Sequence, residues 1–158
     1  MRDALLPVML LSLCAGIAAG AGTERIARLL LAAVGGMGMS MLVRHIVEIP
    51  SEAVLGAAWT AMLACAAVVL AGKAAPPALA IPIAAGAGLL SGLLAADWHA
   101  LLAPPMLIAG ACAARITIAH GLGLATKVVA GWLLAIAALN FSLALLPVTP
   151  GYLPDHLE

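Results

Sequence analysis

Charged residues are scarce in this sequence. Only 9% of its 158 residues are charged, whereas 65% are apolar, and the mean hydropathy is +1.19. A water-soluble fold needs enough polar side chains to cover its surface, and this chain does not contain them. The seven basic residues are balanced by seven acidic ones, so there is no basic excess of the kind that binds nucleic acid. We therefore expect a protein whose surface faces a lipid bilayer.

Aromatic residues and cysteines are also few. The five aromatic residues form only a sparse version of the belt that anchors helices at the membrane surface. Contacts between helices are therefore expected to depend on small side chains. The three cysteines lie in apolar stretches, at spacings that match no metal-binding or redox motif. We interpret them as packing residues, since a buried thiol behaves as a small hydrophobe. They are Cys14, Cys65 and Cys112.

The apolar residues form runs of the length that crosses a bilayer as a helix, and the short segments between the runs hold almost every charge. We predict an all-α fold, a polytopic transmembrane helical bundle that forms a single integral membrane domain over residues 1–158. The first run is expected to be a retained helix rather than a cleaved signal, because Arg25 and Arg28 follow it. The six predicted spans are 4–21, 26–43, 52–71, 78–95, 100–120 and 128–146.

Two local features accompany this prediction. Ser51 precedes the third span and is predicted to cap it, because a serine hydroxyl can accept a hydrogen bond from a free backbone N–H of the first turn. Pro104 and Pro105 interrupt the start of the fifth span. This double proline leaves an alternative open, in which five spans are accompanied by a re-entrant segment.

The basic residues predict the orientation of the chain. With six spans, the first, third and fifth connections lie on one side and hold five of the seven basic residues. The other side holds two, so the five are expected in the cytoplasm and both termini outside, in a bacterial cytoplasmic membrane. The five are Arg25, Arg28, Lys73, Arg115 and Lys127, and the two are Arg2 and Arg44.

Small residues recur at the four-residue spacing that lets two membrane helices approach closely. Gly16 and Gly20 have this spacing in the first span, and Ala84, Gly88 and Gly92 have it in the fourth. The second span carries a further group of three glycines, Gly35, Gly36 and Gly38. The spacing does not distinguish contacts within the bundle from self-association or contacts with other membrane subunits.

The best candidate for a chemical site is a predicted metal site at the end of the second span. Met37, Met41 and His45 are four residues apart and share one face of a continuous helix. Glu48 would extend that face, and the Asp97–His99 turn is expected on the same side of the membrane. Thioether with imidazole suits copper, and imidazole with carboxylate suits zinc. The alternative is that the methionines only pack and the polar residues only occupy loops. Haem held by two histidines is a further alternative, with less to support it.

The spans themselves contain few polar residues. No acidic or basic residue lies near a predicted midplane, where ion-driven transporters usually carry one. Asn140 is the most polar residue there and is expected to bond across to another helix. No nucleophile motif is present, so we expect no catalytic site.

Three functions are consistent with these patterns. The first is a non-catalytic accessory or scaffold subunit of a larger membrane complex. The second is a copper- or zinc-binding membrane protein that uses the Met, His and acidic residues named above. The third is a small transporter or channel for an uncharged solute.

Overall fold

The computed structural model describes residues 5–20, 25–71, 77–95 and 98–145, and these residues form helices joined by short connections. Six α-helices and one short 3₁₀ helix were found in this part of the chain. They are α1 (Leu5–Gly20), α2 (Ile26–Ile46), α3 (Ser51–Leu70), α4 (Pro77–Leu94), η1 (Trp98–Leu102), α5 (Ala103–Ala119) and α6 (Gly123–Leu145). The predicted all-α helical bundle is confirmed.

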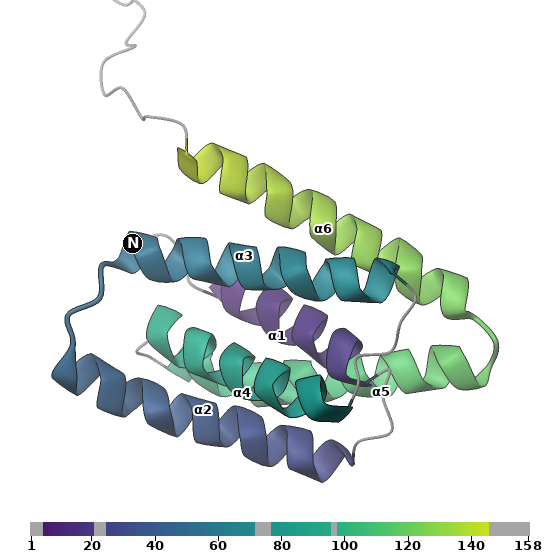
Figure 1. Ribbon diagram of the computed structural model, residues 1–158, viewed down its shortest axis with the longest axis horizontal. Helices are drawn as coiled ribbons and strands as arrows, with labels where there is room; N and C mark the ends of the chain where they lie inside the picture. The colour runs from purple at the N-terminus through teal and green to yellow at the C-terminus, as the bar shows by residue number, and fades with distance from the viewer. Residues whose placement is uncertain (1–4, 21–24, 72–76, 96–97, 146–158) are drawn as a thin grey trace, which may run out of the picture.

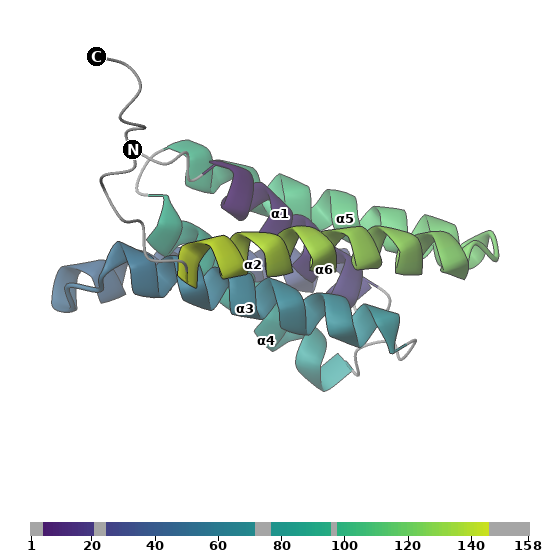
Figure 2. The same cartoon turned by 90° about the horizontal axis from the view of Figure 1, so that it is seen from above.

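Successive helices run in opposite directions across the bundle (Figure 1). Helix α1 lies inside, and α2 and α6 form opposite edges. Helix α2 packs mainly against α4, α5 against α1, and α6 against α3. The view from above shows α5 alongside α1 on one side and α4 on the other (Figure 2). Helix α1 therefore touches most of the other helices and forms the centre of the core.

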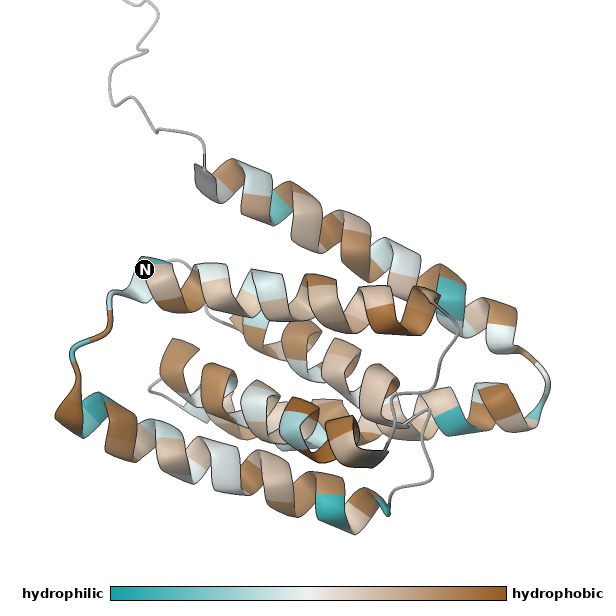
Figure 3. Cartoon of the chain, viewed as in Figure 1, coloured by the Kyte–Doolittle hydropathy of each residue, from teal (hydrophilic) through white to brown (hydrophobic). Residues whose placement is uncertain are grey.

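Hydrophilic residues gather at the two ends of the bundle, and the lengths of the helices are largely apolar (Figure 3). Four helical segments of the described chain are long and apolar enough to cross a membrane: α2, α3, the combined η1 and α5, and α6. Helices α1 and α4 are apolar but shorter. At 1.5 Å per residue, α1 is about 24 Å long, compared with about 30 Å for the hydrocarbon layer. The arrangement is that of an integral membrane protein.

Neighbouring helices cover the short central helix α1 and provide a partner for its last carbonyl group. Nearly all residues of α1 from Leu11 onward are buried against protein rather than exposed to lipid. At its end, the carbonyl oxygen of Gly20 accepts a hydrogen bond from Nε of Arg115 on α5, at 3.3 Å. This carbonyl is one of the last four of the helix, which have no partner within it. Arg115 thus provides a partner for the end of α1.

Three predicted local details were wrong. Helix α2 continues to Ile46 instead of ending near residue 43, because a helix keeps its own backbone hydrogen bonds as it leaves the membrane. Helix α6 begins at Gly123 instead of 128, directly after a turn at Gly121, which has a φ of 71°. Ser51 is the first residue of α3 rather than its cap, since Pro50 occupies the cap position and makes no side-chain cap bond.

The double proline does not produce a re-entrant segment. Pro104 and Pro105 occupy the first turn of α5, immediately after η1. The first turn is the place where a helix tolerates proline, because its N–H groups have no partner within the helix. The six-helix prediction therefore describes this region better than the alternative with five spans.

Glycines bring the helices together at two contacts inside the bundle. Gly16 and Gly20 of α1 lie against the backbone of α5 at Leu107 and Ala111, and Gly110 of α5 lies against α1. In the second contact, Gly36 lies against α4 at Ala85. Gly88 and Gly92 of α4 face Ala33 and Ser40 of α2 in the same contact. The four-residue spacings seen in the sequence therefore pack inside the bundle.

A buried hydrogen bond adds to this packing. The hydroxyl oxygens of Ser12 on α1 and Ser91 on α4 are 3.2 Å apart, and both side chains are fully buried. One hydroxyl donates and the other accepts, so both buried side chains have a partner. Such bonds between membrane helices contribute about 0.6 kcal/mol on average. The pair links α1 to α4, and nothing in the sequence indicates this partner for Ser12.

We expect the Gly88→Ala variant to be destabilised by about 1–3 kcal/mol, the usual cost of overpacking. A Cβ atom on Gly88 would overlap the carbonyl oxygen of Ala33, and backbone atoms cannot move aside without separating α2 from α4. Unfolding in mixed detergent micelles, followed by circular dichroism, measures the change.

Gly86→Ala is the matched control, since Gly86 lies on the same helix and has nothing within 4 Å of its Cβ position. It should be neutral or slightly more stable, because alanine favours a helix by up to about 1 kcal/mol over glycine. Equal loss of stability in both variants would contradict the close-packing interpretation.

Candidate functional site

A groove in the described residues lies at the end of the bundle where α2 and α4 finish. We call it the Met41 groove. It has a volume of about 700 Å³ and is bounded by α2, the end of α4, η1 and the start of α5. Its walls are mainly apolar, and Arg44 is the charged residue in them. The residues that define it are Val34, Met37, Gly38, Ser40, Met41 and Arg44 of α2, with Gly92, Ala95, Trp98, Ala100, Leu101 and Pro104.

Arg44 reaches from α2 to the end of α4. Its Nη2 atom donates a hydrogen bond to the carbonyl oxygen of Leu93, at 2.9 Å. Leu93 lies in the last turn of α4, where the carbonyl groups have no helical partner and the helix dipole places partial negative charge. The bond therefore holds an exposed guanidinium group at the edge of an apolar groove.

Trp98 lies at the same edge of the groove. Its side chain is 63% exposed, and its ring is 4.1 Å from the ring of His99, centre to centre, at 31° to it. Tryptophan is enriched where lipid headgroups meet hydrocarbon, because its ring is apolar and its N–H is polar. Together, Trp98 and Arg44 indicate that this edge of the groove lies at headgroup depth.

The structure brings together some of the predicted metal-site residues. Met37 and Met41 both line the Met41 groove. His45 is exposed in the last turn of α2. Glu48 follows the end of that helix, so it does not continue the helical face as expected, and it is exposed. His99 belongs to η1, and Asp97 lies outside the described residues.

No group of three His, Cys, Asp or Glu side chains that could hold a metal ion was found among the residues that the structure describes. Both thioethers line one groove, whereas His45, Glu48 and His99 are not among its lining residues. The copper or zinc site stays a prediction, and so does the haem alternative.

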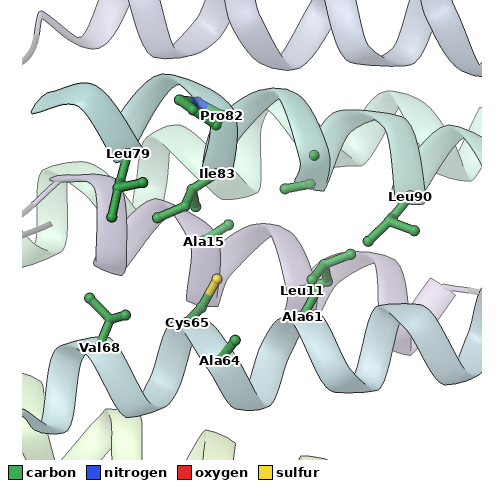
Figure 4. Close-up of a pocket in the computed structure, with 12 residues that line it drawn as sticks. Leu11, Ala15, Ala61, Ala64, Cys65, Val68, Leu79, Pro82, Ile83 and Leu90 are labelled. Carbon is green, nitrogen blue, oxygen red and sulfur yellow. The ribbon is translucent and has the colours of Figure 1, made fainter. Parts of the chain in front are cut away.

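A second groove, the Cys65 groove, lies between α1, α3 and α4 and has a volume of about 370 Å³. Side chains from α3 and α4 face each other across it, and α1 forms its floor (Figure 4). Its lining residues are apolar, apart from the thiol of Cys65. Such walls would accommodate a hydrocarbon chain. Apart from this thiol, the groove offers no polar side chain that could bind a neutral solute, so the transporter hypothesis stays a prediction.

Polar side chains inside the described helices already have partners. The buried ones are Ser12, Ser40, Ser91 and Thr126. Ser40 donates to the carbonyl oxygen of Met37 at 2.6 Å, and Thr126 is 2.8 Å from the hydroxyl of Thr117 on α5. No buried side-chain nitrogen or oxygen in this part of the protein lacks a hydrogen-bond partner.

Asn140 does not make the predicted bond to another helix. Its Nδ2 atom donates to the carbonyl oxygen of Ile136, one turn earlier on α6, at 2.8 Å. Helix α6 is at the edge of the bundle, so this side chain uses the nearest acceptor on its own helix.

Comparisons with protein families, with curated proteins and with solved structures found no match to this chain.

The metal hypothesis predicts that His45→Ala/His99→Ala loses most of the copper or zinc that the purified wild-type protein binds, because imidazole is the ligand common to both metals. Metal analysis of the two proteins after identical purification provides the measurement. Met39→Leu is the control, since Met39 lies between Met37 and Met41 in sequence but outside the groove lining. Equal metal content in wild type and the double variant would exclude this site.

Proposed function

We propose that this chain is a non-catalytic integral membrane protein that acts as an accessory or scaffold subunit through the surfaces of its helices. The observation that carries this proposal is the composition of its interior. The buried polar side chains of the described helices are serines and threonines, each of which has a hydrogen-bond partner. No acidic or basic side chain is buried there, so the interior offers none of the charged groups on which catalysis or ion coupling usually depends.

The outer face of α2 is the best candidate for contact with another helix. Its exposed residues form what we call the α2 stripe: Leu31, Gly35, Met39, Leu42 and Ile46. Spacings of three and four residues place all five on one side of the helix. Exposed apolar side chains alone indicate lipid, so the informative member of the stripe is Gly35.

Gly35 has nothing within 4 Å of its Cβ position, whereas the next residue, Gly36, lies against the backbone of α4. A glycine within a helix costs up to about 1 kcal/mol relative to alanine. Inside this bundle, glycines at helix contacts gain close backbone packing in return. Gly35 offers the same opportunity to a helix of another chain, either a second copy or a different subunit.

We expect the protein, extracted in mild detergent and studied by native mass spectrometry, to have a mass above the 15.7 kDa of one chain. Gly35→Leu should reduce the larger species about tenfold or more, because a leucine side chain would separate the two helices. Its thermal stability should not fall, since the side chain has open space within the chain.

Gly56→Leu is the control for this experiment, because Gly56 on α3 also has nothing within 4 Å. It should leave the larger species intact. A single chain alone in every preparation of the wild type would contradict the proposal, and the measured mass distinguishes a second copy from a different subunit.

We also propose that the protein resides in a bacterial cytoplasmic membrane, with the ends of α1, α3 and α5 in the cytoplasm and both termini outside. The alternating helices support this arrangement. They bring Arg25, Arg28, Arg115 and Lys127 to one end of the bundle and Arg44 to the other. Basic residues near helix ends favour the cytoplasmic side. Lys73 and Arg2 lie outside the described residues.

Cysteine labelling in intact cells tests this orientation. A membrane-impermeant maleimide should label Glu48→Cys, in the connection between α2 and α3, without permeabilisation. Leu122→Cys, in the turn between α5 and α6, should react only after the membrane is permeabilised. Both positions are exposed, so access to each depends on its side of the membrane. The reverse pattern would show that the orientation is inverted.

A further inference from the structure

We propose that the Met41 groove binds an anionic phospholipid, with one acyl chain between α2, α4 and η1 and the phosphate on Arg44. This inference is independent of the proposed subunit role, because it concerns a different face of α2. Three observations support it: the apolar walls of the groove, the guanidinium charge of Arg44 at one end, and the position of Trp98, which indicates that this end lies among the lipid headgroups.

The walls fit hydrocarbon rather than a polar solute. Val34, Met37 and Met41 provide apolar surface along α2, and Leu101 provides it on the opposite wall. Ser40 is the hydroxyl residue in the lining, and its proton is already used in the bond to the carbonyl of Met37. The volume of about 700 Å³ is in the range of ligand pockets in proteins. Methionine walls also adapt readily to a flexible chain.

The charge at the end of the groove has no counter-charge among the described residues. A guanidinium group has five N–H donors, and Arg44 uses one in its bond to the uncharged carbonyl of Leu93. No carboxylate of the described residues forms an ion pair with it. The planar guanidinium group binds phosphate oxygens in pairs, which makes arginine well suited to this ligand.

The same observations favour an anionic lipid over a zwitterionic one. Among the residues that the structure describes, no acidic side chain belongs to the groove lining, so none of these side chains would pair with a positively charged choline or ethanolamine group beside Arg44. Trp98, at the same edge, indicates headgroup depth. A phosphate bound by Arg44 would thus remain among the headgroups while its acyl chain follows the groove. Basic pockets between membrane helices bind anionic headgroups on the cytoplasmic side of membranes, and the same attraction between charges would act at Arg44 on the other side.

The test uses the full chain in detergent, to which phosphatidylglycerol or phosphatidylcholine of the same acyl chains is added. Native mass spectrometry counts the lipids retained by each protein. We expect wild type to prefer phosphatidylglycerol, and Arg44→Gln to lower that preference about fivefold, the contribution of one basic residue near anionic lipid. Lys127→Gln removes a charge from the other end of the bundle and should leave the preference unchanged.

Two further variants separate binding from folding. Arg44→Lys keeps the charge and should retain most of the preference, whereas Arg44→Gln keeps an N–H donor for the carbonyl of Leu93 and loses only the charge; a purely structural role for that bond would affect both variants alike. Gly38→Leu fills the groove without meeting another atom within 4 Å of its Cβ position, and it should reduce retention of both lipids.

Inorganic phosphate should not compete with phosphatidylglycerol, because the acyl chain provides much of the binding. Competition by inorganic phosphate would show an anion site without a lipid site and overturn the proposal. Equal retention of the two lipids by wild type and Arg44→Gln would also overturn it.

Discussion

Close approach of helix backbones is the constraint on which the rest of this structure depends. Within lipid, apolar side chains gain little by leaving the bilayer for another helix, so association relies on close packing and a few hydrogen bonds. This chain achieves that packing with glycine. Gly16, Gly20 and Gly110 join α1 to α5, and Gly36, Gly88 and Gly92 join α2 to α4. The bond between Ser12 and Ser91 connects these two pairs through α1 and α4.

The shortness of α1 follows from the same constraint. A helix surrounded by protein need not match the thickness of the lipid along its own length, because its neighbours cover it. Arg115 then bonds the carbonyl of Gly20, where α1 ends. The long helices α2 and α6 lie at the edges, where a helix has to face lipid over most of its length. A helix that faces lipid has to be long enough to cross the hydrocarbon layer, whereas a helix that faces protein can be shorter.

The sequence predicts the number and directions of the helices well, because lipid excludes charges from the spans and leaves them in the connections. It predicts the ends of helices less well. Arg44 and His45 lie beyond the predicted second span, which ends near residue 43, yet α2 continues through both. The spacing of the glycines is visible in the sequence, but their neighbours are not. Gly35 and Gly36 are adjacent and identical, and only the fold distinguishes the exposed one from the buried one.

Part of the candidate site could be predicted from the sequence, and part of it could not. The shared face of Met37 and Met41 follows from helical spacing, and both do line one groove. The role of Arg44 could not be predicted, because its partner, Leu93, is far away in sequence and is brought near only by the packing of α2 against α4. In the sequence, Arg44 is only one of the basic residues that predict orientation. The structure places it at the edge of a groove.

Helix α2 connects the separate proposals. At about 100° per residue, Gly36 and Gly38 lie about 100° and about 60° from Gly35, on opposite sides of it around the helix axis. Gly36 belongs to the face that packs on α4, Gly38 and Met41 to the groove, and Gly35 to the α2 stripe. Each face carries its own glycine, and each glycine allows a different neighbour to come close: a helix of the same chain, an acyl chain, or a helix of another chain. Because the faces do not share these glycines, a change at one tests one neighbour at a time.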